Sequence, residues 1–211
     1  MDIAAATDRE RQALADTLDR VGSAAPTLCP PWTTAELVAH VVSLDRAHGA
    51  LTFAGRWLVS RGVRLNDRAG GLTARAIARE RAPFGELVDR LRRPTPSLLR
   101  RPSVAIVGLF EVWVHHYDVS AANGIDRGDA PAELEAVIPW LLRYHHALFE
   151  SQPVRVEAGS ASWSSGAPAS VVVRGDVPDL VLWLAGRLAM GQVEFAGPAA
   201  AVDALRSAPR I

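Results

Sequence analysis

A glutamate and a histidine stand four residues apart in a strongly apolar stretch, at Glu111 and His115. In an α-helix this spacing places both side chains on one face, about one turn from each other. The residues between them are Val112, Trp113 and Val114, so the pair is expected to be buried. An unpaired buried carboxylate is costly, and a metal ion shared with the imidazole removes that cost. Carboxylate oxygen and imidazole nitrogen suit zinc and similar ions.

A third candidate ligand, His40, lies in a second apolar run, ELVAHVV at 36–42. If the helices that contain the two runs pack side by side, His40 faces Glu111 and His115. Two imidazoles and one carboxylate leave one coordination position open, which is typical of catalytic zinc. Asp118 follows Glu111 by seven residues on the same face. We expect Asp118 either to orient a ligand through a hydrogen bond or to pack near the helix end.

Spacing alone leaves other interpretations open. A Glu-x-x-x-His pair is also typical of a surface salt bridge or of a satisfied pair in a core. His48 lies two turns after His40 and is an additional or alternative ligand. His116 points away from the face of the proposed ligands. His145 and His146 are expected to be exposed or to form interhelical hydrogen bonds.

The single cysteine, Cys29, excludes an internal disulfide bond. It stands in a proline-containing segment just before an expected helix start, where a thiol can be reactive. The alternative interpretation is a small buried apolar side chain in a turn.

Apolar spacing and cap signals predict the helices that position these residues. Helices are expected over 7–21, from Thr33 or Thr34 to about Val59, over 72–91 with an interruption at Pro83, over 104–122 and over 130–149. A polar loop is expected over 61–71. Trp32, just before the second helix, is expected to pack against its first turns.

The pattern changes after Glu150. Valine-rich segments at 154–156 and 171–173 flank a Ser/Gly-rich turn at 159–166, which predicts a β-hairpin. Helices over 178–189 and 199–206 and a short strand at 192–195 follow. The sequence therefore predicts an α+β protein, with a four-helix bundle and an extra helix in a domain at 1–149 and a small α+β domain at 150–211.

Composition limits the classes of function. The 211 residues are 49% hydrophobic, which is typical of a globular protein. The 23 basic side chains, all arginine, balance 23 acidic ones, and the densest basic cluster, at 90–101, is interrupted by prolines; this argues against a nucleic-acid partner. No apolar run approaches the roughly 20 residues that cross a bilayer, and no signal peptide is recognisable, so we expect a cytoplasmic protein without a membrane partner.

Three segments resemble the signatures of one metal-binding family. Residues 25–40, APTLCPPWTTAELVAH, resemble its PTLC-x-x-W-T-x-x-x-L-x-x-H signature. Residues 111–119, EVWVHHYDV, resemble its Glu-x-x-x-His-His-x-Asp-Val segment, and residues 180–187, LVLWLAGR, its L-x-x-W-x-x-G-R helix. The family is related to mycothiol-dependent maleylpyruvate isomerase and, more distantly, to the DinB-like helical bundles. The resemblance spans nearly the whole chain and keeps the order of the segments.

The resemblance implies a DinB-like bundle that binds a divalent metal, with zinc expected, through His40, Glu111 and His115. It also implies a thiol cofactor, mycothiol, which is the low-molecular-weight thiol of actinobacteria. An arginine-only composition is typical of a high-GC genome and agrees with that source. The resulting hypothesis is a mycothiol-dependent transferase or isomerase that acts on a small electrophilic molecule. Arg187 is then expected to contact an acidic substrate or the thiol cofactor, or else to form a salt bridge.

Two other functions stay open at this point. One is metal-dependent hydrolysis by a bound water, for which Asp118 is the candidate general base. The other is a non-catalytic binding or regulatory module in which the ion only ties two helices together, and a fourth protein ligand such as His48 would favour it.

Overall fold

The structure is a computed structural model that describes residues 1–45, 77–96, 100–187 and 192–207. Its contacts divide the chain into two compact units, which meet in the sequence at Glu133 and Leu134. The described part of the first unit is helical and the second contains a four-stranded sheet, so the predicted α+β class is confirmed. The domain limits 1–149 and 150–211 stay a prediction, and the two divisions differ in where they place residues 134–149.

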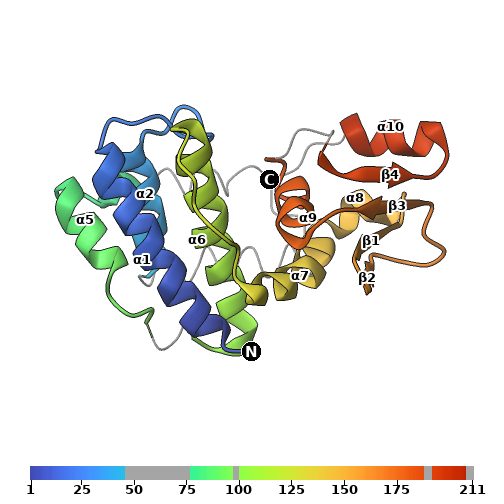
Figure 1. The fold of residues 1–211 in the computed structure, drawn as a ribbon, viewed down its shortest axis with the longest axis horizontal. Helices are drawn as coiled ribbons and strands as arrows, with labels where there is room; N and C mark the ends of the chain where they lie inside the picture. Colours follow the sequence, from blue (N-terminus) through green and yellow to red (C-terminus); the bar gives the residue numbers. More distant parts are fainter. Residues whose placement is uncertain (46–76, 97–99, 188–191, 208–211) are drawn as a thin grey trace. The chain divides into compact units, whose positions relative to one another are not determined.

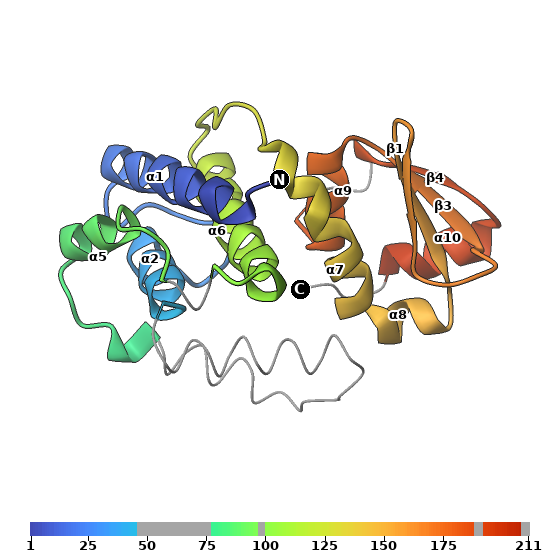
Figure 2. The same ribbon diagram turned by 90° about the horizontal axis from the view of Figure 1, so that it is seen from below.

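The described part of the first unit is built from helices that pack on one another (Figures 1 and 2). They are α1 (Ile3–Val21), α2 (Thr34–Ser43), α5 (Phe84–Leu91) and α6 (Pro102–Ala122). Helix α6 contacts both α1 and α2, and α5 contacts α1 and α2. The two helices predicted to carry the metal ligands, α2 and α6, therefore lie side by side.

Local hydrogen bonds explain where α1 and α2 begin. The Asp2 carboxylate accepts from the backbone N–H of Ala5 at 3.0 Å, so α1 begins before residue 7, the predicted start. The side chain of Glu36 accepts from the backbone N–H of Thr33 at 2.9 Å, which makes a capping box. Thr33, and not Thr34, is therefore the N-cap of α2.

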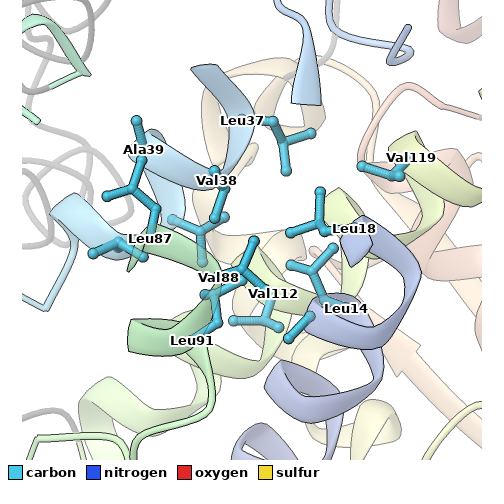
Figure 3. Close-up of a cluster of buried hydrophobic side chains, with 13 residues drawn as sticks. Leu14, Leu18, Leu37, Val38, Ala39, Leu87, Val88, Leu91, Val112 and Val119 are labelled. Atoms are coloured by element: carbon cyan, nitrogen blue, oxygen red, sulfur yellow. The ribbon is translucent and has the colours of Figure 1, made fainter. Parts of the chain in front are cut away.

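The core of the first unit forms where α1, α2, α5 and α6 meet (Figure 3). Its buried side chains include Leu14, Leu18, Leu37, Val38, Leu87, Val88, Leu91, Val112 and Val119. In helix α6, all residues from 109 to 116 are buried. A helix that is apolar on every face packs inside a protein, so any polar side chain in this stretch needs an internal partner.

The second unit contains a sheet with the strand order β2-β1-β3-β4. The strands are β1 (Val154–Ala158), β2 (Ala161–Ser164), β3 (Val171–Arg174) and β4 (Glu194–Ala196). Helix α7 (Val137–Tyr144) contacts α9 (Val177–Leu184) and β2, and α9 also contacts β1. Helices α8 (His146–Glu150) and α10 (Ala199–Ser207) complete the described part.

The predicted hairpin between the two valine-rich segments is wrong. Strands β1 and β3 pair in parallel, with Val154 opposite Val171. The Ser/Gly-rich segment is not only a turn, because it contains β2, which forms the antiparallel hairpin with β1 and places Val156 opposite Trp163. Both valine-rich strands have buried side chains, and alternation of apolar residues does not reveal strand direction.

The helix predicted over 130–149 is also wrong as one continuous element. A 3-10 helix (Ala132–Ala136), α7 and α8 replace it. Pro139 lies in the first turn of α7, where its missing N–H is tolerated, but inside a longer helix its ring would clash with the preceding turn. The second interruption is at His145, between α7 and α8. Its imidazole donates a hydrogen bond to the carbonyl of Leu184, the last residue of α9, at 2.9 Å.

Some predicted elements fall on residues that the structure does not describe. The second helix ends at Ser43, and its predicted extension to Val59, the loop over 61–71, the first part of the helix over 72–91 and His48 lie outside the described residues. The predicted interruption at Pro83 is confirmed, because Pro83 precedes the first residue of α5. Among the described residues, we find no helix with the length and apolarity that a membrane-spanning segment needs.

Leu14→Ala is expected to lower the free energy of unfolding by about 2–5 kcal/mol, because Leu14 is fully buried among α1, α2, α5 and α6. Chemical denaturation followed by circular dichroism measures the loss. The matched control is Leu28→Ala, because Leu28 is 43% exposed and its replacement is expected to change stability by no more than about 0.5 kcal/mol. Equal losses of unfolding free energy in both variants would contradict the placement of Leu14 in the core.

Candidate metal centre

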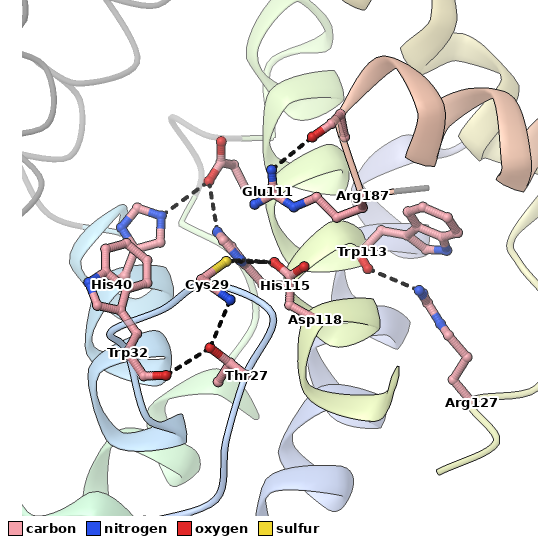
Figure 4. A network of polar contacts seen from close by, with 11 residues as sticks. Thr27, Cys29, Trp32, His40, Glu111, Trp113, His115, Asp118, Arg127 and Arg187 are labelled. Atoms are coloured by element: carbon pink, nitrogen blue, oxygen red, sulfur yellow. Dashed lines mark hydrogen bonds and ion pairs between the residues drawn. The ribbon is translucent and has the colours of Figure 1, made fainter. Parts of the chain in front are cut away.

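The structure brings the three predicted ligands together. His40 projects from α2, and Glu111 and His115 project from α6 toward the same point (Figure 4). The Nε2 atom of His40 lies 3.3 Å from Oε2 of Glu111, and Nε2 of His115 lies 3.6 Å from the same oxygen. One ligand atom from each residue lies within 4.8 Å of the other two, and all three residues are buried.

These distances fit one tetrahedral ion. Zinc binds imidazole nitrogen and carboxylate oxygen at about 2.0–2.2 Å, so two ligand atoms on one ion are about 3.4 Å apart. The two measured separations, 3.3 and 3.6 Å, lie on either side of that value. The donor set of two nitrogens and one oxygen is also one that zinc accepts. His40, Glu111 and His115 can therefore hold a divalent ion with only small movements.

Asp118 contacts His115 on the opposite edge of its ring. Its Oδ2 atom lies 3.0 Å from Nδ1 of His115, and the carboxylate is fully buried. A proton on Nδ1 donated to this oxygen leaves Nε2 with a free lone pair that faces Glu111. Carboxylate–histidine pairs of this kind fix the orientation of a ligand ring in metal sites.

The charge state of His115 reflects these surroundings. Burial acts to lower the pKa of His115, but the hydrogen bonds and charges of Asp118 and Cys29 act in the opposite direction. The net result is a pKa above the ordinary value of 6.5. The ring is thus held by acceptors on its Nδ1 edge.

Cys29 is neither an isolated thiol nor a purely apolar side chain. Its thiol donates to Oδ2 of Asp118 at 3.0 Å, and Sγ lies 4.0 Å from Nδ1 of His115. The loop is tied at two points: Thr27 Oγ1 accepts from the backbone N–H of Cys29, and the backbone N–H of Leu28 donates to the carbonyl of Asp118. This contact could not be foreseen from the sequence, because no spacing rule relates residue 29 to residue 118.

Trp32 lies beside the candidate centre. Its ring centroid is 5.2 Å from that of His40 and 6.3 Å from that of His115, and the indole is only partly buried. Its position before the cap of α2 was foreseen. Its ring contacts, however, involve two of the candidate ligands.

A second polar network lies on the side of α6 away from the candidate centre. The Glu10 carboxylate of α1 accepts from His116 at 2.7 Å and from Arg127 at 2.7 Å. The other ring nitrogen of His116 lies 2.9 Å from the hydroxyl of Thr17. The Arg127 guanidinium also stacks 4.3 Å from the centre of the Trp113 ring. His116 therefore joins α6 to α1, in agreement with the prediction that it points away from the ligands.

Arg187 belongs to the second unit. Its guanidinium donates to the backbone carbonyl of Ala185 at 2.8 Å, and its backbone N–H donates to Leu182. Its predicted role toward a substrate or cofactor stays a prediction.

Comparisons with known proteins agree with the resemblance found in the three sequence segments. No curated protein matches the chain. A crystal structure of the mycothiol-dependent maleylpyruvate isomerase is 16% identical over 92% of this chain and 90% of that chain, with a TM-score of 0.56. A crystal structure of a histidine-to-alanine mutant of the mycothiol-dependent maleylpyruvate isomerase is 17% identical over 92% and 91%, with a TM-score of 0.57. At such low identity these matches establish the fold alone.

The family assignment comes from the sequence. The model described as the mycothiol maleylpyruvate isomerase N-terminal domain matches residues 4–120, which include His40, Glu111 and His115. This match covers more than half of the chain, and the chain therefore belongs to the mycothiol maleylpyruvate isomerase N-terminal domain family.

Proposed function

We propose that the protein binds one divalent metal ion, with zinc as the resident ion, through His40, Glu111 and His115. We further propose that it is a mycothiol-dependent transferase or isomerase that acts on a small electrophilic molecule. One observation carries the metal assignment: two imidazoles from different helices converge on one buried carboxylate oxygen at 3.3 and 3.6 Å. A shared ion would offset the cost of burying this carboxylate.

Three protein ligands leave one position for an external ligand, as in catalytic zinc sites. A metal ion in this position supplies charge that keeps a coordinated thiol deprotonated at neutral pH. The residues of the chain would hold and orient this arrangement. Asp118 would fix the ring of His115, and Trp32 would shield the ring of His40 from water on one side.

Membership of the family supports a thiol as the external ligand. The two structural neighbours are mycothiol-dependent maleylpyruvate isomerases by name, and the family model carries the same thiol in its description. We therefore propose mycothiol as the cofactor and leave the electrophile at the level of a small molecule.

Arg187 is proposed to bind an anionic group of that substrate or of the thiol. Arg187→Ala should then raise KM more than it lowers kcat.

Metal content is the direct test of the ligand assignment. The purified protein is expected to carry about one equivalent of zinc. His115→Ala should lose most of it and His40→Ala should retain less of it than the unaltered protein, because removal of one of three ligands leaves an incomplete site. Elemental analysis after gel filtration measures the content. His146→Ala, which alters a histidine of the second unit, is the matched control and should keep the metal. Equal metal content in all four proteins would contradict the assignment.

Titration calorimetry can test whether the protein binds mycothiol. Mycothiol is expected to bind the zinc-loaded protein and to release about one proton, because the coordinated form is the thiolate. S-methyl mycothiol lacks that proton and should bind far more weakly. If the zinc-loaded protein does not bind mycothiol but hydrolyses esters or amides, it is a metal-dependent hydrolase. If it neither binds mycothiol nor hydrolyses these substrates, the ion only joins α2 to α6.

Asp118→Ala is expected to weaken zinc affinity by about 10–100-fold, the usual effect of removing the partner of a ligand imidazole. Asp118→Asn keeps an acceptor for the ring N–H and should lose less. Competition with a coloured chelator measures both affinities. If Asp118→Ala binds zinc as tightly as the unaltered protein, Asp118 does not orient His115.

A further inference from the structure

A thiol, a carboxylate and an imidazole nitrogen converge on the edge of His115 that faces away from Glu111. Sγ of Cys29 lies 3.0 Å from Oδ2 of Asp118 and 4.0 Å from Nδ1 of His115. Nδ1 of His115 lies 3.0 Å from the same Asp118 oxygen. These atoms form a second group that could hold a metal ion, with one ligand atom from each of the three residues (Figure 4).

The spacing of this second group also fits a tetrahedral ion. Zinc–sulfur bonds are about 2.3 Å and zinc–nitrogen or zinc–oxygen bonds about 2.0–2.2 Å. Ligand atoms on one ion are then about 3.6 Å apart where sulfur is involved and about 3.4 Å apart otherwise. The measured separations of 4.0, 3.0 and 3.0 Å differ from these values by only a few tenths of an ångström to about 0.6 Å.

We propose that Cys29, Asp118 and His115 form a second, alternative position for a thiophilic divalent cation such as zinc or cadmium. This position uses Nδ1 of His115, whereas the first position uses Nε2. Its donor set contains a thiolate, which favours softer ions than the set of His40, Glu111 and His115 does. Cys29 is only partly buried, whereas Asp118 and His115 are buried. The inference does not depend on the proposed thiol-dependent activity.

Proton balance makes the two positions compete. A neutral imidazole has one protonated and one free nitrogen, so His115 can ligate only one ion without losing its last ring proton. When an ion binds at Nδ1, the ring proton moves to Nε2, which faces Glu111, and the Cys29 thiol releases its proton to solvent as the sulfur–metal bond forms. When an ion binds at Nε2, the ring proton lies at Nδ1 beside Asp118. We therefore expect one ion per chain, shared between two positions.

Cobalt and cadmium can detect the second position because Cys29 is the only cysteine of the chain. Any thiolate-to-metal charge-transfer band in the ultraviolet must then come from Cys29. With one equivalent of cadmium or cobalt, His40→Ala is expected to show a strong band, since the first position is damaged and the second is intact. The unaltered protein should show a weaker band, because the ion divides between the two positions.

Two variants serve as controls for the band. Cys29→Ser keeps a hydroxyl that can donate to Asp118 but has no sulfur, so it should show no band while still binding the ion at the first position. His115→Ala should lose both the band and the tight binding, because both positions share its ring. Absence of the band in both the unaltered protein and His40→Ala, or a band of unchanged strength in His115→Ala, would overturn the second position.

Failure of the second position and failure of the first give different results. The double variant with Cys29→Ser and His40→Ala separates the two cases. If the first position is wrong, this double variant and Cys29→Ser alone have the same affinity for the ion. If only the second position is wrong, the double variant loses the ion, and no protein in the series shows a thiolate band.

Discussion

Burial of the Glu111 carboxylate is the constraint on which the first unit depends. It lies within residues 109–116 of α6, all of them buried, so its charge has to be offset within the protein. Its partners include the rings of His40 and His115, at 3.3 and 3.6 Å. One partner comes from a neighbouring helix, so α2 has to lie against α6 in a fixed register. The capping box at Thr33 and Glu36 sets the first turn of α2 and thereby helps to fix the position of His40 relative to Glu111.

The ring of His115, a candidate metal ligand, is oriented by contacts at its Nδ1 edge. Asp118 contacts the ring edge opposite Glu111, and the loop that carries Cys29 is tied to the same Asp118 through its thiol and through the backbone of Leu28. This loop therefore borders the candidate metal centre although it lies in no regular element. Glu111 lies near Nε2 of His115, and Asp118 and Cys29 lie near Nδ1, which is the basis for two possible ion positions on one ring.

Much of this arrangement could be predicted from the sequence, and the reasons are local. Glu111, His115 and Asp118 share a helix, so helical spacing alone places them on one face, and the apolar residues around them predict burial. The contact of Cys29 with Asp118 could not be predicted, because it depends on the path of a loop. The parallel pairing of β1 with β3 was missed because buried strands look alike in either direction. The interruption before α7 could have been recognised from Pro139, which disfavours one helix over 130–149.

The two consecutive histidines of α6 contact different sets of residues. His115 faces Glu111 and Asp118, whereas His116 faces Glu10 and Thr17 on α1. Each residue of an α-helix turns the chain by about 100°, so one inserted or deleted residue between 111 and 118 would rotate one set of contacts away from its partners. Related chains should consequently vary in length in their connecting loops while the spacing within this segment of α6 stays constant through evolution.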